Sequence, residues 1–224
     1  MNHSTNLVDD DEIGSYEIEV LDKECLLIRK ALMLEEQKRL FEYIQENDRT
    51  PSLEGRPKPM VPSPKTLILG EDQPSLLYEF GQISVVNDMV TKATKILKDK
   101  DLHIINGLDI SKPFTSLSMA TIQYEAPHGH FAPHIDHCND SFVFLMSLGC
   151  TANFMVKGPT MDAQKHFKFH SGDLLIFNAS TKAALLHSVV SIDEDGNNDA
   201  KILGKQYPSL TKYRYGVQCR FHIK

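Results

Sequence analysis

Hydrophobic and polar residues follow two different patterns along the chain, and the change falls near residue 114. In the first half, Glu17–Leu21 alternates as a strand does. Leu34–Asn47 instead carries its apolar side chains at helical spacing. A second helical pattern runs from about Pro74 to Lys98, and Gly81 could divide it in two. We therefore predict one short strand and two helical segments before residue 114.

From Phe114 onward, short β-prone runs are separated by turn residues, which is typical of an all-β sandwich or barrel. The predicted strands are Leu117–Tyr124, Ser141–Leu148, Asn153–Val156, His166–Phe169, Leu174–Phe177, His187–Ile192 and Tyr213–Ile223. Phe142–Cys150 is the longest apolar run and indicates a buried strand. The proline-rich residues 50–64 and the polar residues 193–199 are predicted to be loops, and Gly204–Ser209 is predicted to be irregular.

Length and composition favour a single globular domain, because 224 residues with 41% hydrophobic side chains can bury an ordinary core. No apolar run approaches the roughly 18 residues of a membrane span, so no membrane partner is expected. The acidic start, Asp9–Glu12, is unlike a signal peptide. Four cysteines without CxxC or paired spacing favour reduced thiols in the cytoplasm or nucleus.

The formal net charge of −6 is unevenly distributed. Residues 1–50 hold 13 acidic and 6 basic side chains, so the remainder has one more basic than acidic residue. Residues 1–14 are predicted to be an acidic, disordered tail. The nearly neutral body neither requires nor excludes a polyanionic partner.

Candidate metal ligands are His134, Asp136 and His187. Two imidazoles and one carboxylate can hold ferrous iron on one face and leave the other face open for chemistry. Residues i and i+2 of a strand project to the same side, so His134 and Asp136 could chelate together. Two alternatives stay open. His187 could be an ordinary core histidine, and a zinc site could use His128 and His130 with His134.

Candidate anion ligands are Arg214 and Arg220, which lie an even number of residues apart on one predicted strand and so share a face. A dicarboxylate buried in a barrel needs a partner, and arginine offers a planar, bidentate fork. The alternating apolar residues 213–221 occupy the other face. The arginine face could therefore be the outer, solvated one, and the spacing does not decide.

Together these residues resemble the AlkB-type iron(II)/2-oxoglutarate dioxygenases. The motifs that carry the resemblance are Phe114…Ile122-Gln123-Tyr124…His134-Ile135-Asp136, Ser147-Leu148-Gly149, Phe169-His170-Ser171-Gly172-Asp173-Leu174-Leu175, His187-Ser188-Val189 and Arg214-Tyr215-Gly216-Val217-Gln218-Cys219-Arg220. Upstream, Pro64-Lys65-Thr66-Leu67-Ile68-Leu69-Gly70 is similar to the family's lid segment. The match covers roughly residues 60–224.

The resemblance implies a mainly β fold with flanking helices (α+β), in which a double-stranded β-helix (jelly roll) core has N-terminal helices packed outside. The implied boundaries are a dioxygenase core at 114–224 and a helical extension at 15–113 with a substrate lid around 51–70. Fe(II) would be held by His134, Asp136 and His187. Arg214 would pair with the distal carboxylate of 2-oxoglutarate, Tyr124 would hydrogen-bond that carboxylate, and Arg220 would lie nearer the iron.

The implied activity is oxidative demethylation of N-methylated nucleobases in RNA or single-stranded DNA, with release of formaldehyde, succinate and CO2. An extruded base could be gripped by His128, His130, Phe131 and His137 beside the metal motif.

Three features depart from the family pattern: Ile122 and Gly216 stand where asparagine is frequent, residues 51–70 contain no aromatic side chain, and the gap from His187 to Arg214 is long. An oxygenase acting on a protein or small molecule, or a non-catalytic binding module, therefore stays open. We expect a monomer.

Overall fold

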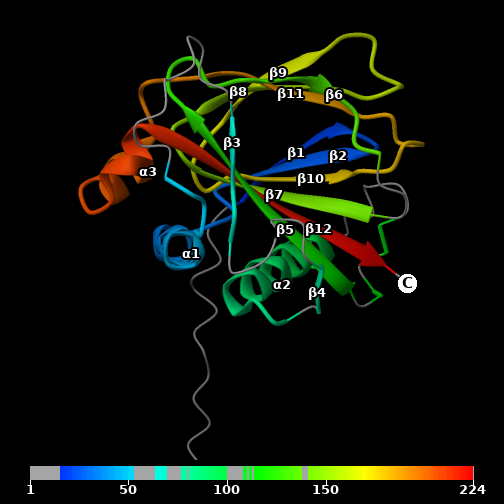
Figure 1. Cartoon of the computed structure of the whole chain (residues 1–224). Coiled ribbons are helices and arrows are strands. Elements are labelled where there is room, and N and C mark those ends of the chain that lie inside the picture. Colours follow the sequence, from blue (N-terminus) through cyan, green and yellow to red (C-terminus); the bar gives the residue numbers. More distant parts are fainter. Residues whose placement is uncertain are drawn as a thin grey trace, which may run out of the picture.

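The computed structural model describes residues 16–52, 64–69, 77–79, 81–99, 108–109, 111–112, 114–137 and 141–223. Two antiparallel sheets lie face to face, and helices cover the outer face of the larger sheet (Figure 1). In the larger sheet the order is β1 (Glu17–Asp22), β2 (Cys25–Arg29), β10 (Leu174–Asn178), β7 (Ser141–Gly149), β12 (Tyr213–Ile223), β5 (Phe114–Glu125) and β3 (Lys65–Leu67), with β4 (Leu77–Glu79) also paired to β5. In the smaller sheet it is β6 (Phe131–His134), β11 (Leu186–Ile192), β8 (Ala152–Lys157) and β9 (Lys165–Phe169).

The central strand β7 shows why the middle of the chain reads as a continuous apolar run. Phe144 and Met146 point into the cluster beneath the helices, whereas Val143 packs into the second cluster between the sheets. Because both faces of β7 are covered, alternation with polar residues is absent. The larger sheet thus separates two apolar cores.

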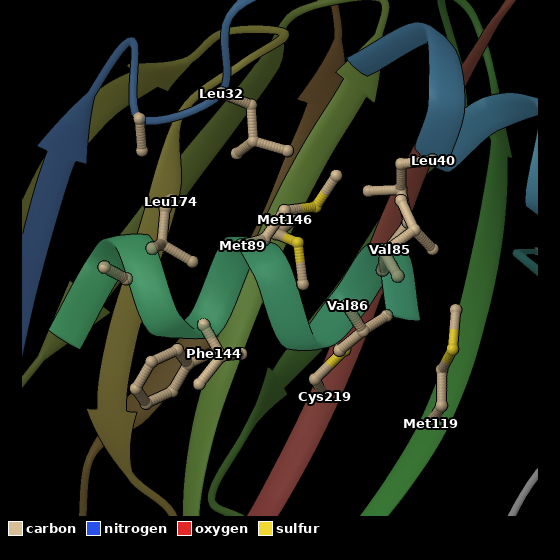
Figure 2. Close-up of a cluster of buried hydrophobic side chains, with 14 of the residues drawn as sticks. Leu32, Leu40, Val85, Val86, Met89, Met119, Phe144, Met146, Leu174 and Cys219 are labelled. Carbon is tan, nitrogen blue, oxygen red and sulfur yellow. The ribbon is translucent and has the colours of Figure 1, made fainter. Parts of the chain in front are cut away.

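Helices α1 (Leu34–Asn47) and α2 (Ser84–Asp99) close the outer core. At the start of α1, the Glu36 side chain accepts a hydrogen bond from the Met33 backbone N–H at 2.6 Å. Figure 2 shows Val86 and Met89 of α2 lying against strand side chains that include Phe144. Each such side chain, when fully buried, contributes about 1.5–3 kcal/mol to the apolar driving force.

A third helix, α3 (Asn198–Gly204), and a 3-10 turn, η2 (Pro208–Thr211), lie between β11 and β12. The Asn197 side chain caps α3 by accepting a hydrogen bond from Ala200 N at 3.0 Å. Among the described residues, no helix is long and apolar enough to cross a membrane.

The predicted fold class, mainly β with flanking helices, is confirmed, and the helix at Leu34–Asn47 has the predicted bounds. The helix predicted from Pro74 was wrong over Leu77–Glu79, because the edge of β5 pairs with these residues as a strand. The loop predicted at 193–199 is present up to residue 197, but its last two residues begin α3. The irregular stretch predicted at 204–209 is likewise present at 205–207, whereas Gly204 ends α3 and Pro208 begins η2.

The range 15–113 is not only helical, because β1 and β2 form a hairpin that joins the larger sheet through β10. The boundary at 113/114 stays a prediction. Residues 1–14 and most of the predicted lid at 51–70 lie outside the described residues, although β3 occupies 65–67 of that range.

Candidate metal and 2-oxo acid site

Three candidate ligands converge at one end of the space between the sheets. His134 ends β6 and pairs directly with His187 of β11, so that their ring centroids are 4.2 Å apart. His134 Nε2 lies 3.7 Å from Asp136 Oδ1. One ligand atom from each of the three residues lies within 4.8 Å of the others, so the group could hold a metal ion.

Contacts with backbone carbonyl groups fix the tautomer of both imidazoles. His134 Nδ1 lies 2.9 Å from the Ala132 carbonyl oxygen, and His187 Nδ1 lies 3.2 Å from that of Leu185. A carbonyl oxygen only accepts, so each Nδ1 carries the proton and donates it. Each Nε2 then keeps a free lone pair, which is the form that a metal ligand needs.

Asp136 reaches the group differently from the prediction. We expected His134 and Asp136 to share one face of a strand, but β6 ends at His134 and Asp136 follows the strand. Its carboxylate is oriented by Arg220, whose Nη2 lies 2.7 Å from Asp136 Oδ2. Arg220 Nη1 also lies 3.5 Å from the Ser141 hydroxyl oxygen. Arg220 therefore contacts Oδ2 of Asp136, whereas Oδ1 of Asp136 lies beside His134.

His187 is held in its neutral form. Burial and the nearby His134 lower the pKa of His187 to about 4 from its usual 6.5, against the opposing effect of Asp136. Its ring lies against Phe177, with centroids 4.9 Å apart. A buried, neutral imidazole with one free nitrogen is suited to bind a cation.

Arg214 is a charged residue that is only 1% exposed. The rings of Tyr124 and Phe169 each lie 5.2 Å from its guanidinium carbon. Its Nε and Nη2 have no hydrogen-bond partner in the described part of the chain. Burial lowers the pKa of Arg214, and contact with Tyr124 opposes that change. A buried guanidinium with free donors fits a carboxylate that comes from outside the protein.

A cavity with about 410 Å³ of empty space connects Arg214 to the two histidines. Its apolar wall is formed by Ile122, Leu145, Phe154, Phe177 and Val189, and its polar side chains are Tyr124, His134, His187, Ser188, Arg214 and Gln218. The arginine face of β12 thus points into the cavity, which answers the question that spacing left open. The cavity offers a dicarboxylate an anion partner at one end and the metal ligands at the other.

Not every predicted site residue reaches this cavity. Tyr124 and Phe131 line it, whereas the side chains of His128, His130 and His137 are exposed and are not part of its wall. In the described residues, only His134, Asp136 and His187 form a cluster able to hold a metal, so the zinc alternative with His128 and His130 gains no support. Sequence reasoning missed Gln218, although its even spacing from Arg214 places both on one face.

Comparison with known proteins agrees with this geometry. A sequence model of the 2OG-Fe(II) oxygenase superfamily matches residues 24–221. The chain belongs to this superfamily. Fe(II) and 2-oxoglutarate are accordingly its cofactor and co-substrate, and the donor set and the buried guanidinium fit them.

Solved structures place this oxygenase among jelly-roll folds. The structure of OsALKBH1 aligns with 92% of this chain and 100% of its own, at 19% identity and a TM-score of 0.60. A prolyl hydroxylase from Trichoplax adhaerens, in complex with a hypoxia inducible factor peptide fragment, covers 89% of this chain and 84% of its own at 10% identity (TM-score 0.50). A Pseudomonas putida prolyl-4-hydroxylase covers 90% and 93% at 12% identity (TM-score 0.49). No curated protein matches the chain. At these identities the likeness shows the fold, which agrees with the AlkB-type resemblance.

Proposed function

We propose that this oxygenase oxidatively demethylates N-methylated nucleobases in RNA or single-stranded DNA, with release of formaldehyde, succinate and CO2. His134, Asp136 and His187 are the proposed Fe(II) ligands. Their support is the convergence of the three side chains within 4.8 Å and the free Nε2 of each imidazole. Arg220 is proposed to orient Asp136 through the 2.7 Å contact between the two side chains.

The observation that carries the co-substrate assignment is that Nε and Nη2 of Arg214, in the same cavity as the histidines, lack a hydrogen-bond partner among the described residues. Arg214 is proposed to bind the distal carboxylate of 2-oxoglutarate, and the hydroxyl of Tyr124 is proposed to donate a hydrogen bond to that carboxylate. Because the site is buried, water competes weakly for the guanidinium. The charge of the incoming carboxylate would satisfy the donors that the protein leaves free.

When bound, Fe(II), 2-oxoglutarate and the second co-substrate, O2, would supply the oxidising chemistry: one oxygen atom of O2 would hydroxylate a C–H bond, and the other would enter the succinate that forms as 2-oxoglutarate loses CO2. The protein holds the reactants in place and keeps water out. Phe154 and Phe177 pack around the ring of His187, at 6.3 and 4.9 Å between centroids. A hydroxylated N-methyl group then releases formaldehyde and leaves the demethylated base.

Support for a nucleobase substrate comes from the rim of the cavity. Phe131 is 37% exposed, and its ring lies edge-on to His134 with centroids 4.5 Å apart. An exposed aromatic ring beside the metal ligands could stack on an extruded base. His128, His130 and His137 are exposed on the neighbouring segments and are proposed to contact the substrate.

Basic side chains support a polyanionic substrate only in part. Lys157 and Lys182 are exposed and could contact phosphate, whereas Lys168 is paired with Asp193 at 2.7 Å. Arg214 and Arg220 are directed to the cavity and to Asp136, so they do not add to the exposed basic side chains. Phosphate binding would therefore rest on a few exposed lysines.

The test is a joint measurement of succinate and formaldehyde from purified protein, Fe(II), 2-oxoglutarate and a pool of N-methylated oligonucleotides. We expect both products to rise together with wild type and to be absent with His134→Ala. Phe131→Ala should weaken substrate use by about tenfold, because one stacking contact is worth about 1–3 kcal/mol. Succinate without formaldehyde would contradict nucleobase demethylation and favour a protein or small-molecule substrate. Neither product, with iron bound, would favour a binding module.

A further inference from the structure

Phe169 is a buried aromatic residue to which the proposed function gives no role. It ends β9 in the smaller sheet, where it pairs with Ala152 of β8, and its side chain is 0% exposed. The guanidinium carbon of Arg214, on β12 of the larger sheet, lies over its ring at 5.2 Å from the centroid. This contact therefore joins the two sheets beside the cavity that Arg214 lines.

A second ring lies at the same distance from the guanidinium. Tyr124 of β5 is the direct cross-strand neighbour of Arg214, and its ring centroid is also 5.2 Å from the guanidinium carbon. The quadrupole of an aromatic ring attracts a cation that lies over its face within about 6 Å, and the attraction is stronger where water is excluded. The buried charge of Arg214 is thus in contact with aromatic rings from both sheets.

These rings contact the guanidinium without using its free hydrogen-bond donors. Nε and Nη2 of Arg214 have no partner among the described residues, and both lie on one edge of the planar group. From this edge two parallel N–H bonds can reach both oxygens of a carboxylate. A carboxylate of the protein at this edge would compete with an incoming ligand, whereas the face of a ring does not. The rings therefore offset part of the cost of burying the charge and leave the edge open.

Neighbouring aromatic side chains hold the ring of Phe169 in place. Its centroid lies 5.5 Å from that of Phe154 and 6.1 Å from that of Phe167. Phe154 is stacked on His187 in turn, with centroids 6.3 Å apart. Because Phe169 is fully buried and packed on two other rings, it offers the guanidinium a fixed surface.

We propose that Phe169 is a positioning residue, which holds the guanidinium of Arg214 in place in the empty site through a cation–π contact. This inference rests on the proposed function of Arg214 as the partner of the distal carboxylate of 2-oxoglutarate. A guanidinium that is already ordered loses less conformational freedom when the carboxylate binds, so the ring strengthens binding through preorganisation. Phe169 acts on the carboxylate only through Arg214.

The first experiment titrates two ligands by calorimetry into protein loaded with Mn(II) as a stand-in for Fe(II). 2-Oxoglutarate has the distal carboxylate, whereas 2-oxovalerate has the same chain length and 2-oxo acid group but ends in a methyl group. Phe169→Leu removes the aromatic face and keeps an apolar side chain. We expect 2-oxoglutarate to bind about 2–30-fold more weakly, the range of one cation–π contact, and 2-oxovalerate to bind as it does to wild type.

The same variant should leave the Kd for Mn(II) unchanged, because Phe169 is not among the candidate metal ligands. In turnover assays, KM for 2-oxoglutarate should rise while kcat stays close to wild type. A loss of 2-oxoglutarate alone distinguishes the positioning of Arg214 from a general change in the shape of the cavity.

The second experiment changes the charge of the ring face with little change in its size. 3,4,5-Trifluorophenylalanine in place of Phe169 withdraws electron density from the ring and so weakens its attraction for a cation. In ligand-free protein we expect Tm to fall by about 2–8 °C relative to the same change in an Arg214→Leu background. That background has neither the charge nor a sulfur atom, so it corrects for the effect of fluorine on packing. The near-isosteric ring also gives the answer if Phe169→Leu fails to fold.

Phe144→Leu is the matched control. Phe144 is also 0% exposed, but it packs in the cluster beneath the helices and does not line the cavity with Arg214. The substitution should lower Tm through lost burial, whereas the folded protein should bind both ligands with wild-type affinity. Trifluorination at position 144 should have the same effect on Tm with arginine or leucine at position 214.

The possible results separate this inference from the proposed function. Wild-type protein that binds Mn(II) but not 2-oxoglutarate would contradict the proposed function and the inference with it. If wild type binds 2-oxoglutarate, then unchanged affinity in Phe169→Leu, or equal losses of both ligands, would overturn the inference alone. An effect of fluorination that is the same with and without the guanidinium would also overturn it. A loss confined to 2-oxoglutarate, together with a fluorine effect that depends on Arg214, would support it.

Discussion

The two faces of strand β12 are built from the same alternating sequence but carry different kinds of residue. The face beneath the helices consists of Tyr215, Val217, Cys219 and Phe221, all at most 5% exposed and part of one apolar cluster. The opposite face consists of Arg214, Gly216, Gln218 and Arg220, of which the first three line the cavity. One strand therefore serves packing on one side and chemistry on the other.

The two faces differ in how completely their side chains are packed or hydrogen-bonded. On the packed face, Phe221 meets Phe114 and Phe144 with ring centroids 4.8 and 5.2 Å apart. On the cavity face, Arg214 keeps two nitrogens without a partner. A buried group left unpaired lowers stability, and proteins tolerate this mainly at functional sites. Stability and ligand binding should therefore respond to different substitutions on the same strand.

The largest expected effect comes from removing Asp136, a proposed metal ligand. Asp136→Ala deletes one donor and leaves Arg220 without its 2.7 Å partner. Outer-shell changes typically weaken metal binding about 10–100-fold, so loss of a direct ligand should exceed that range. Metal titration followed by calorimetry measures the Kd. The conservative Asp136→Glu should retain part of the affinity, and unchanged binding in Asp136→Ala would contradict the assigned ligand set.

On the packed face, Phe221→Ala should lower the free energy of unfolding by about 3–5 kcal/mol, because it removes a fully buried ring from between two others. The affinity of the folded fraction for 2-oxoglutarate should stay close to wild type. Urea unfolding measures the first quantity and calorimetry at low temperature measures the second. A selective loss of affinity with normal stability would show that the two faces are not separate.

Lower pH should destabilise the metal-free protein through His187. Its pKa is about 4 in the folded protein and 6.5 when unperturbed, so the unfolded state binds more protons between these values. The free energy of unfolding is therefore highest above pH 6.5 and falls as pH decreases toward 4. Between pH 7 and 5 the loss should be about 2 kcal/mol. Unfolding curves across this range test it, and His187→Gln should flatten the dependence.

A smaller gain in stability is expected from Arg214→Met. Methionine has a similar reach, fills the space between Tyr124 and Phe169, and removes the unpaired buried charge. The free energy of unfolding should rise by about 1–2 kcal/mol in the absence of ligand. Thermal and urea unfolding of the two proteins give the difference. A marked loss of stability would mean that the contacts of the guanidinium with Tyr124 and Phe169 stabilise the fold by more than its two unpaired nitrogens cost.

Much of the fold could be predicted because local patterns and tertiary structure agree. The helix at Leu34–Asn47 and the strands from residue 114 onward follow their periodicity. The short strand β4 was missed because its pairing with β5 is a long-range contact that overrides a local helical pattern. The start of α3 was missed because the polar residues 193–199, which include its first two residues, resemble a loop.

For the site, residue types and spacing could name His134, Asp136 and His187 as candidate ligands, whereas the geometry that brings the three together could not be predicted. The spacing of Arg214 and Arg220 shows that they share one face of β12. It does not show whether that face lines a cavity or meets solvent. The different roles of the two arginines depend on contacts with Tyr124 and Asp136, which lie far apart in sequence.

The cavity face of β12 is proposed to bind the co-substrate through Arg214. The most direct test is calorimetric titration of 2-oxoglutarate into Mn(II)-loaded wild type, Arg214→Met and Phe221→Ala under identical conditions. The account predicts that Arg214→Met weakens 2-oxoglutarate by about 100-fold or more, since truncating one partner of a buried charge pair costs about 2–5 kcal/mol. Folded Phe221→Ala should bind as wild type does. Equal affinity of wild type and Arg214→Met would contradict the claim.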